Sequence, residues 1–339
     1  MGGVSLTVII PISFAFRGVD TLRRLVNILT DEEFRNAELI VVLGTTGGLL
    51  EKICEWFTIK LGARLIKVSV SKRAFSAARL RNAGLQKATA DYVLFWDVDL
   101  RAPAGLLDKL FREMLAKSEP FLIIPCLYLS SRARTVLRKR DKWKCSDYWI
   151  DRLKAFDQDQ ILYMAFNTST LFVKRDAVIE VGAFDEKFSG HGYEDFDLCC
   201  RLAYRFSEKP FPTDMLVNLP TNSPAFSRGF RAYLNQFSVP QLIKGIFTLH
   251  EFHPLVRSRE YLGRRQENYQ VFASQIRPLI AEDAPAPISA MRWIQDFLER
   301  EQLSLQEYSF LFCNMSHSHR MPGAKWRRFR KSVAKLIKG

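Results

Sequence analysis

The first hundred residues alternate between strand-like and helix-like patterns, and this alternation strongly limits the folds that the chain can adopt. Short apolar runs rich in β-branched residues occupy positions 5–10, 38–43, 64–70 and 92–96. Segments with apolar residues at helical spacing lie between them, at 19–29, 49–61 and 76–88. Strands that alternate with such helices form βαβ units and a parallel sheet covered by helices. We therefore predict an α/β fold whose first strand ends at Pro11.

The remaining chain is less regular. We expect a strand at 120–129, strand character in 161–173, and helices at 175–181 and 195–204. Residues 205–275 read as irregular, and two or three helices follow from residue 288, after the Pro-rich stretch 281–287. This organisation predicts a main domain over 1–275 and a C-terminal helical extension over 276–339.

Composition narrows the class of protein. The 339 residues are 47% hydrophobic and 25% charged, as in ordinary globular proteins. No apolar run approaches the roughly 18 residues needed to span a bilayer, and no secretory signal pattern is visible. The six cysteines form no CxxC pair, which favours free thiols in a reducing compartment. We expect a cytoplasmic protein.

The net charge of +14 comes almost entirely from two segments. Residues 132–144 hold seven basic residues against Asp141, and residues 323–339 hold seven and no acid. Such local excess is typical of proteins with anionic partners. In the segment 324–339, apolar residues recur at helical spacing between Lys and Arg. This pattern predicts either a basic amphipathic helix on the inner face of an anionic membrane or a solvated basic tail.

Two acids, Asp97 and Asp99, directly follow the strand-like run 92–96. Ligands of open α/β sheets bind at the carboxyl ends of strands, where acids are poorly placed for a core. Carboxylates there can hold a divalent cation that bridges the protein to a diphosphate. The alternative is a solvated acidic loop.

Two further clusters carry chemically active side chains. Glu194 and Asp195 follow the glycine-containing turn that ends at Gly192, where the start of a helix stabilises an ionised carboxylate. They could supply a base or simply an acidic helix start. His250 and His253 are three residues apart, a spacing that can direct both imidazoles at one metal, although single histidines more often serve other roles.

In this order, the motifs resemble the GT-A fold of nucleotide-sugar glycosyltransferases of family 2. The opening VSLTVIIPI, the segment AARLRNAGLQKA with VLFWDVDL, and GAFDEKFSGHGYEDFDLCCRL are similar to β-1,4-galactosyltransferases and bacterial chondroitin-type polymerases. The resemblance covers about residues 4–272. It implies a Rossmann-like, mostly parallel sheet flanked by helices.

The resemblance also implies roles for the motif residues. Asp99, His253 and His250 would ligate Mn²⁺ or Mg²⁺, and Asp97 would face the ribose or the metal. Asp195 would be the general base on the acceptor hydroxyl, and Glu194 would hold the acceptor sugar. Further positions implied to bind the nucleotide-sugar are Pro11, Arg17, Lys72, Arg79, Asn167 and Gly192.

The sequence departs from these relatives after the second strand-like run, where Val42-Leu43-Gly44-Thr45 lacks the acid that usually reads the base. Uridine remains the expected base. The basic segment 131–154 is outside the motif pattern.

We therefore expect an inverting, metal-dependent glycosyltransferase. Its donor would be a UDP-sugar, and its acceptor a growing surface polysaccharide or lipid-linked oligosaccharide. The alternatives are an inactive scaffold of the same fold or a polyanion-binding protein. Nucleic acid is not the expected partner, because the basic residues form two short segments without a recognition motif.

Overall fold

The computed structural model describes residues 5–15, 18–71, 75–138, 142–167, 169–254 and 263–313. Six strands form the main sheet, in the order β3-β2-β1-β4-β9-β6. They are β1 (Leu6–Ser13), β2 (Glu38–Thr45), β3 (Arg64–Ser69), β4 (Tyr92–Phe95), β6 (Phe121–Ile123) and β9 (Leu171–Lys174). Among them, β9 runs antiparallel to both of its neighbours. The predicted α/β class with a mostly parallel sheet is confirmed.

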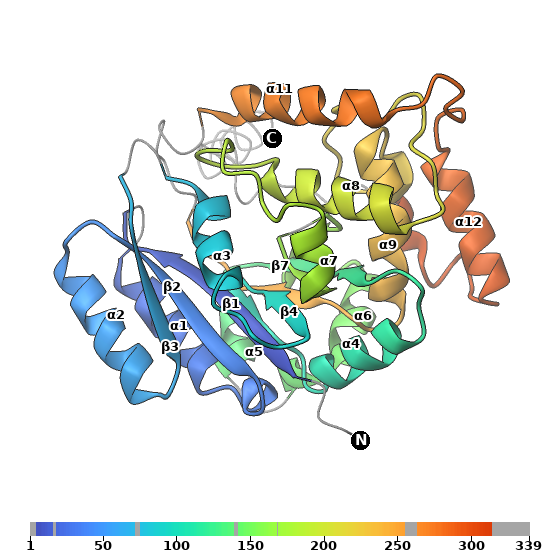
Figure 1. Cartoon of the computed structure of the whole chain (residues 1–339). Helices are drawn as coiled ribbons and strands as arrows, with labels where there is room; N and C mark the ends of the chain where they lie inside the picture. Colours follow the sequence, from blue (N-terminus) through green and yellow to red (C-terminus); the bar gives the residue numbers. More distant parts are fainter. Residues whose placement is uncertain are drawn as a thin grey trace, which may run out of the picture.

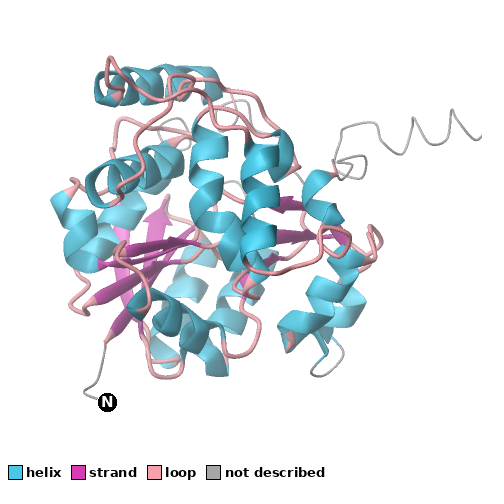
Figure 2. Cartoon of the chain, turned by 90° about the vertical axis from the view of Figure 1, so that its right-hand side faces the viewer, coloured by secondary structure: helices cyan, strands magenta, loops and turns pink. Residues whose placement is uncertain are grey.

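Helices cover both faces of this sheet because alternate strand residues are apolar on each side (Figures 1 and 2). Val8 and Val41 face a core closed by α1 (Val19–Leu29), α2 (Leu49–Lys60) and α4 (Leu106–Leu115). Ile9 and Val42 face the opposite core. That core is closed by α3 (Ala77–Leu85), α7 (Arg175–Glu180), α8 (Glu194–Phe206), α9 (Phe230–Ile243) and α11 (Arg265–Ile276).

A second sheet has the order β5-β10-β7-β8. Its strands are β5 (Leu100–Arg101), β7 (Cys126–Leu129), β8 (Ile161–Ala165) and β10 (Thr248–His250). Residues of this sheet share a third core with α6 (Ser146–Lys154) and α12 (Ala290–Arg300). The short helix α5 (Arg134–Arg138) and α6 make up most of the basic segment 131–154.

Several predicted boundaries are wrong. Strand β1 continues through Pro11 to Ser13, because its pairing with β4 ends at Ile9 and one neighbouring strand is left beside the proline. The single strand expected at 120–129 is two strands, split at Pro125 and assigned to different sheets.

Residues 205–275 are not irregular, since they contain α9, β10 and α11. Helix α9 buries side chains on nearly all sides, so it lacks the apolar stripe by which an amphipathic helix is found, and Pro240 lies within it. Helix α12 lies in the predicted C-terminal extension, yet it packs into the third core with Trp149 and Phe247. The division at 275/276 stays a prediction.

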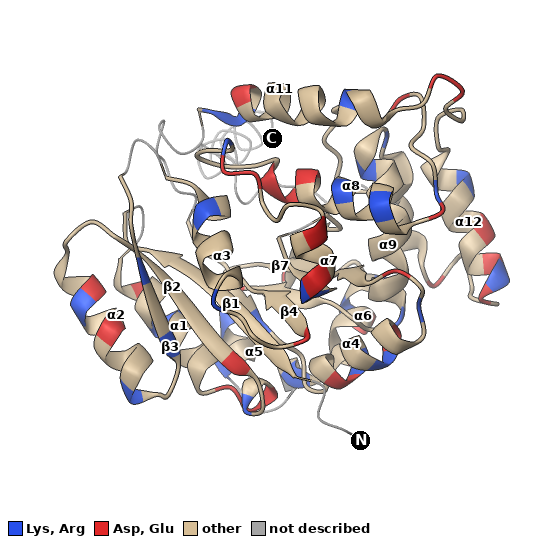
Figure 3. Cartoon of the chain, viewed as in Figure 1, with Lys and Arg blue, Asp and Glu red and all other residues tan. Residues whose placement is uncertain are grey.

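All six cysteines are described, and no disulfide joins them. None of the described helices has the length and apolar character to cross a membrane. The basic tail 324–339 lies outside the described residues. Over the described helices, Lys and Arg are interspersed with Asp and Glu in the view of Figure 3.

Candidate active site

Asp97 and Asp99 lie where the strand order of the main sheet changes direction. Strand β1 has β2 on one side and β4 on the other, and the two acids directly follow β4. Where the strand order reverses in this way, the connections that leave the two strands run to opposite sides and a crevice forms at the carboxyl ends, which is the usual ligand site of open α/β sheets.

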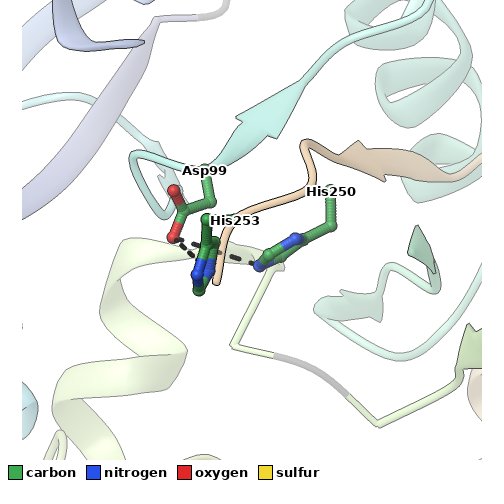
Figure 4. A group of neighbouring side chains, drawn as sticks. All are labelled: Asp99, His250 and His253. Carbon is green, nitrogen blue, oxygen red and sulfur yellow. Dashed lines mark ion pairs between the residues drawn. The ribbon is translucent and has the colours of Figure 1, made fainter. Parts of the chain in front are cut away.

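Pairing of two short strands brings Asp99 to the two histidines. β5 begins one residue after Asp99 and pairs antiparallel with β10, so that His250 lies opposite Leu100. The backbone N–H of Glu251 donates to the carbonyl of Asp99 at 2.9 Å, which extends this pairing. The segment that leaves β10 then carries His253 back to the same carboxylate (Figure 4).

The three side chains form a cluster that could hold a metal ion. The Nε2 atoms of His253 and His250 lie 3.3 and 4.0 Å from Oδ2 of Asp99. One ligand atom from each residue lies within 4.8 Å of the others. The ring of His250 stacks on Tyr128, with centroids 4.1 Å apart, which fixes its orientation. One carboxylate oxygen and two imidazole nitrogens are a donor set that fits a divalent transition-metal ion.

Asp97 faces a different partner. Nη2 of Arg81 donates to Oδ1 of Asp97 at 3.0 Å, and the Ser169 hydroxyl donates to Oδ2. Among the described residues, the metal-competent cluster is that of Asp99, so Asp97 and Asp99 point to separate tasks.

Arg81 also holds the second acidic motif. Its Nη1 donates to Oδ1 of Asp195 at 3.0 Å and lies 3.6 Å from Oε1 of Glu194. The Arg81 side chain is 3% exposed, and those of Glu194 and Asp195 are 8% and 23% exposed. One buried guanidinium therefore joins Asp97 to two acids about a hundred positions away in the sequence.

Burial and neighbouring charges shift the pKa values of Arg81 and Asp195. Burial alone would lower the pKa of Arg81, but the carboxylates of Asp195, Asp97 and Glu194 raise it, so Arg81 stays protonated. Burial raises the pKa of Asp195 to about 8, with the Glu194 and Asp97 carboxylates adding to the rise and Arg81 opposing it. Once deprotonated, a carboxylate with such a pKa is a stronger base than an ordinary aspartate.

A strained turn delivers the second motif to Arg81. Gly190, Gly192 and Tyr193 have φ angles of 73°, 97° and 78°, and α8 begins at the next residue, Glu194. A side chain at Gly192 would place its Cβ 2.7 Å from Nη1 of Arg265. The Nδ2 group of Asn268, on α11, donates to the carbonyls of Ser189 and Gly192 at 2.9 Å each. Helix α11 thus fixes the turn, and the turn fixes the acids.

The other predicted binding residues are more dispersed. Pro11 lies in β1 opposite Val42, and Arg79 is exposed on α3. Asn167 donates from Nδ2 to Asn235 at 3.0 Å, two positions before the Ser169 that contacts Asp97. Arg17 and Lys72 lie outside the described residues. The predicted nucleotide-binding roles of all these residues stay predictions.

Three charged or amide side chains that organise the site were not predicted. Arg81 and Asn268 are described above, and Arg24 donates from Nη1 to Oδ1 of Asp99 at 3.0 Å. Arg24 had a visible signal, because it falls among Thr21, Leu25 and Ile28 on the buried face of an amphipathic helix. An arginine there needs buried acceptors.

Comparisons with known proteins agree with the motifs. The model of the family "Glycosyltransferase like family 2" matches residues 7–277. The amylovoran biosynthesis glycosyltransferase AmsB of Erwinia amylovora is 24% identical over 221 residues, which are 61% of this chain and 67% of that protein.

Solved structures give weaker likenesses. Staphylococcus aureus TarS 1–349 in complex with UDP-GlcNAc is 16% identical, with a TM-score of 0.41, over 60% of this chain and 54% of that one. GalNAc-T7 with UDP, GalNAc and Mn²⁺ is 12% identical, with a TM-score of 0.45, over 80% and 48%. The chain therefore spans only about half of each of these two structures. Because the family model covers most of the chain, this protein belongs to the glycosyltransferase-like family 2 and is a glycosyltransferase.

Proposed function

We propose that this protein is an inverting, metal-dependent glycosyltransferase. It transfers a sugar from a UDP-sugar to a hydroxyl group of a growing surface polysaccharide or lipid-linked oligosaccharide. The general base is Asp195, and the cation is held by Asp99, His250 and His253.

The observation that carries this proposal is the contact of Arg81 with both acidic motifs. Arg81 joins Asp97, two residues from the metal-competent cluster, to Glu194 and Asp195 at the start of α8. A base and a cation site must lie on either side of one sugar, because the attacking hydroxyl and the departing diphosphate are on opposite sides of the anomeric carbon. A single guanidinium that bridges the two motifs supports their belonging to one site.

Asp195 performs the proton transfer in this reaction. Its carboxylate takes the proton of the acceptor hydroxyl while the hydroxyl oxygen forms a bond to the anomeric carbon. The bond from that carbon to the diphosphate oxygen breaks, and the diphosphate keeps the electron pair. Attack from the side opposite the diphosphate inverts the anomeric centre, so an α-linked donor gives a β-glycoside.

The donor set of the cluster favours Mn²⁺ over Mg²⁺. Magnesium prefers oxygen ligands in a strict octahedron, whereas two of the three protein ligands are imidazole nitrogens. A bound cation would neutralise the charge that develops on the departing diphosphate. Glu194 would then hold the acceptor sugar beside the base.

The acceptor is proposed from the relative in amylovoran biosynthesis and from the basic segments. A glycan attached to a lipid would lie at the inner face of the membrane, where an anionic surface could attract the tail 324–339. The tail lies outside the described residues. The attraction to the membrane is tested by deleting 324–339 and measuring how much of the protein binds to anionic vesicles, which we expect to decrease.

The reaction itself is tested by exchanging Asp195 for Asn, which keeps the size of the side chain and removes the base. We expect transfer of labelled sugar from UDP-sugars to a glycan acceptor to fall about 10²- to 10⁴-fold, the usual contribution of a positioned base. Asp176→Asn is the matched control, because Asp176 is 89% exposed on α7. Full transfer activity in the folded Asp195→Asn protein would refute the assignment of the base.

A further inference from the structure

We propose that Arg24 is a positioning residue for the divalent-cation site. Arg24 occupies one carboxylate oxygen of Asp99, so that the other oxygen faces the two histidines and Asp99 binds the cation through a single oxygen. The inference rests on the proposed metal site. It assigns to that site a residue of α1, Arg24, whose cationic side chain cannot itself ligate the metal.

The two oxygens of Asp99 have different partners. Oδ1 accepts a hydrogen bond from Nη1 of Arg24 at 3.0 Å. Oδ2 is the oxygen that lies 3.3 Å from His253 and 4.0 Å from His250. Because Arg24 holds Oδ1, the carboxylate cannot rotate freely, and its second oxygen stays directed at the imidazoles.

The same guanidinium holds the backbone that carries His253. Nη1 of Arg24 donates to the carbonyl of Glu251 at 3.3 Å, and Nη2 donates to the carbonyl of Phe252 at 2.9 Å. These carbonyls belong to the two residues just before His253. One rigid, planar group therefore sets the distance between Asp99 and the histidine segment, a task that the point charge of a lysine could not reproduce.

Arg24 is buried and is surrounded by acidic groups. Its side chain is 1% exposed, and Nε donates to Oδ2 of Asp20 at 2.8 Å. The carboxylate of Glu251 lies 3.8 Å from Nη2. Because Asp20, Asp99 and Glu251 surround it, the positive charge of Arg24 is compensated. We therefore expect that Arg24 favours cation binding by orienting Asp99 more than it disfavours it by electrostatic repulsion of the cation.

The test is the affinity of the protein for Mn²⁺ alone, measured by electron paramagnetic resonance without any nucleotide. We compare the wild-type protein with Arg24→Lys and Arg24→Gln. Loss of a group that orients a ligand commonly weakens metal binding about 10- to 100-fold, and we expect both variants to fall in that range. The visible spectrum of bound Co²⁺ should also change, because Asp99 becomes able to bind through both oxygens.

Arg23→Gln is the matched control. Arg23 is the neighbouring residue on α1 and shares Asp20 and Glu251 with Arg24, but among the described residues its ion pairs do not include Asp99. Its loss removes the same charge from the same helix. We expect Mn²⁺ affinity within twofold of the wild type and an unchanged Co²⁺ spectrum.

Three outcomes would overturn the inference. Tighter Mn²⁺ binding in Arg24→Gln with no change in Arg24→Lys would mean that Arg24 acts by charge repulsion. Equal weakening in Arg23→Gln would mean that the charge of α1 matters and the contact with Asp99 does not. Folded Arg24 variants with wild-type affinity would remove the role altogether. Failure of the metal site itself gives a different result, namely no Mn²⁺ binding by the wild-type protein.

Discussion

At the scale of single residues, Arg81 is the positive charge that the acids of the proposed site share. Its guanidinium contacts Asp97 and Asp195 at 3.0 Å and compensates the negative charge that these acids and Glu194 bring into a buried place. Without the guanidinium of Arg81, three carboxylates would lie close together in a buried environment of low dielectric constant, and ionising all of them would cost free energy. Arg81 therefore links the position of the proposed base, Asp195, to its pKa.

This arrangement predicts the pH dependence of the reaction. Burial raises the pKa of Asp195 to about 8, and only the deprotonated form can accept a proton. The value of kcat/KM should therefore fall as the pH is lowered through that pKa. Since Arg81 lowers the pKa of Asp195, Arg81→Met should raise it further and move the midpoint of the profile to higher pH.

The measurement is the pH profile of kcat/KM for the wild-type protein, Arg81→Met and Arg35→Met. Arg35 is 73% exposed and pairs with Glu32, so its loss should leave the midpoint in place. A midpoint that stayed the same in Arg81→Met would show that the guanidinium does not tune the base.

The residues of the site that could be predicted from the sequence are those that lie in recognisable motifs. Asp99 is far in the chain from His250 and His253, yet the residue types and the resemblance were enough to select all three, and the structure brings them together. The resemblance gave Arg24 and Arg81 no role. The position of Arg24 on the apolar face of a helix signals its burial, but the carboxylates that each arginine contacts come from distant segments, which a linear sequence does not display.

At the scale of elements, the close approach of α3 to the sheet positions Arg81. Gly84, one turn after Arg81, lies against β1 and β2, and a Cβ built there would be 2.5 Å from Cγ2 of Ile9 and 3.0 Å from Cγ2 of Val42. Any larger residue must push α3 away from the strands. Because Arg81 is on the same helix, such a shift would also move the guanidinium away from the acids.

We therefore predict that Gly84→Ala destabilises the protein. Alanine in a helix gains about 0.5–1 kcal/mol over glycine, but overpacking of a buried interface typically costs about 1–3 kcal/mol. The steric term should win, with a net loss of about 1–2 kcal/mol in the free energy of unfolding measured in urea. Gly18→Ala, whose Cβ would meet nothing within 4 Å, is the control. Greater stability of Gly84→Ala would contradict this packing.

The helices that the sequence predicts well are those with one buried face and one solvated face. Helix α1 has the bounds predicted from the sequence, since one face is buried and the other is solvated. Helix α9 escaped prediction because it is buried nearly all round. The three-residue strand β10, which delivers His250, is shorter than any pattern that periodicity could detect. Its pairing with β5 is a tertiary contact between distant segments.

At the scale of the whole molecule, the chain beyond residue 276 contributes to the core that supports the site. Leu298 of α12 is 1% exposed and shares the third core with Trp149 and Phe247. That core also contains Leu249 of β10, the residue before His250. The folding of α12 and the position of the histidine segment are thereby coupled.

Leu298→Ala should destabilise the protein by about 2–5 kcal/mol, the usual cost of truncating a buried leucine. Because the third core is shared, thermal unfolding should remain a single transition at a lower temperature. Leu305→Ala is the control, since Leu305 is 49% exposed. A separate early transition that left the rest of the protein intact would instead mean that 276–339 folds independently.

The most direct test of the central claim is thermal unfolding with a panel of UDP-, GDP-, CDP- and TDP-sugars, each with and without Mn²⁺. A ligand at a hundred times its dissociation constant stabilises a protein by about 2.7 kcal/mol, which is readily measured. We predict that a UDP-sugar raises the unfolding temperature only when Mn²⁺ is present, and that Asp99→Asn abolishes this increase. Equal stabilisation without Mn²⁺, or an unchanged response in Asp99→Asn, would contradict a metal-dependent donor site at Asp99, His250 and His253.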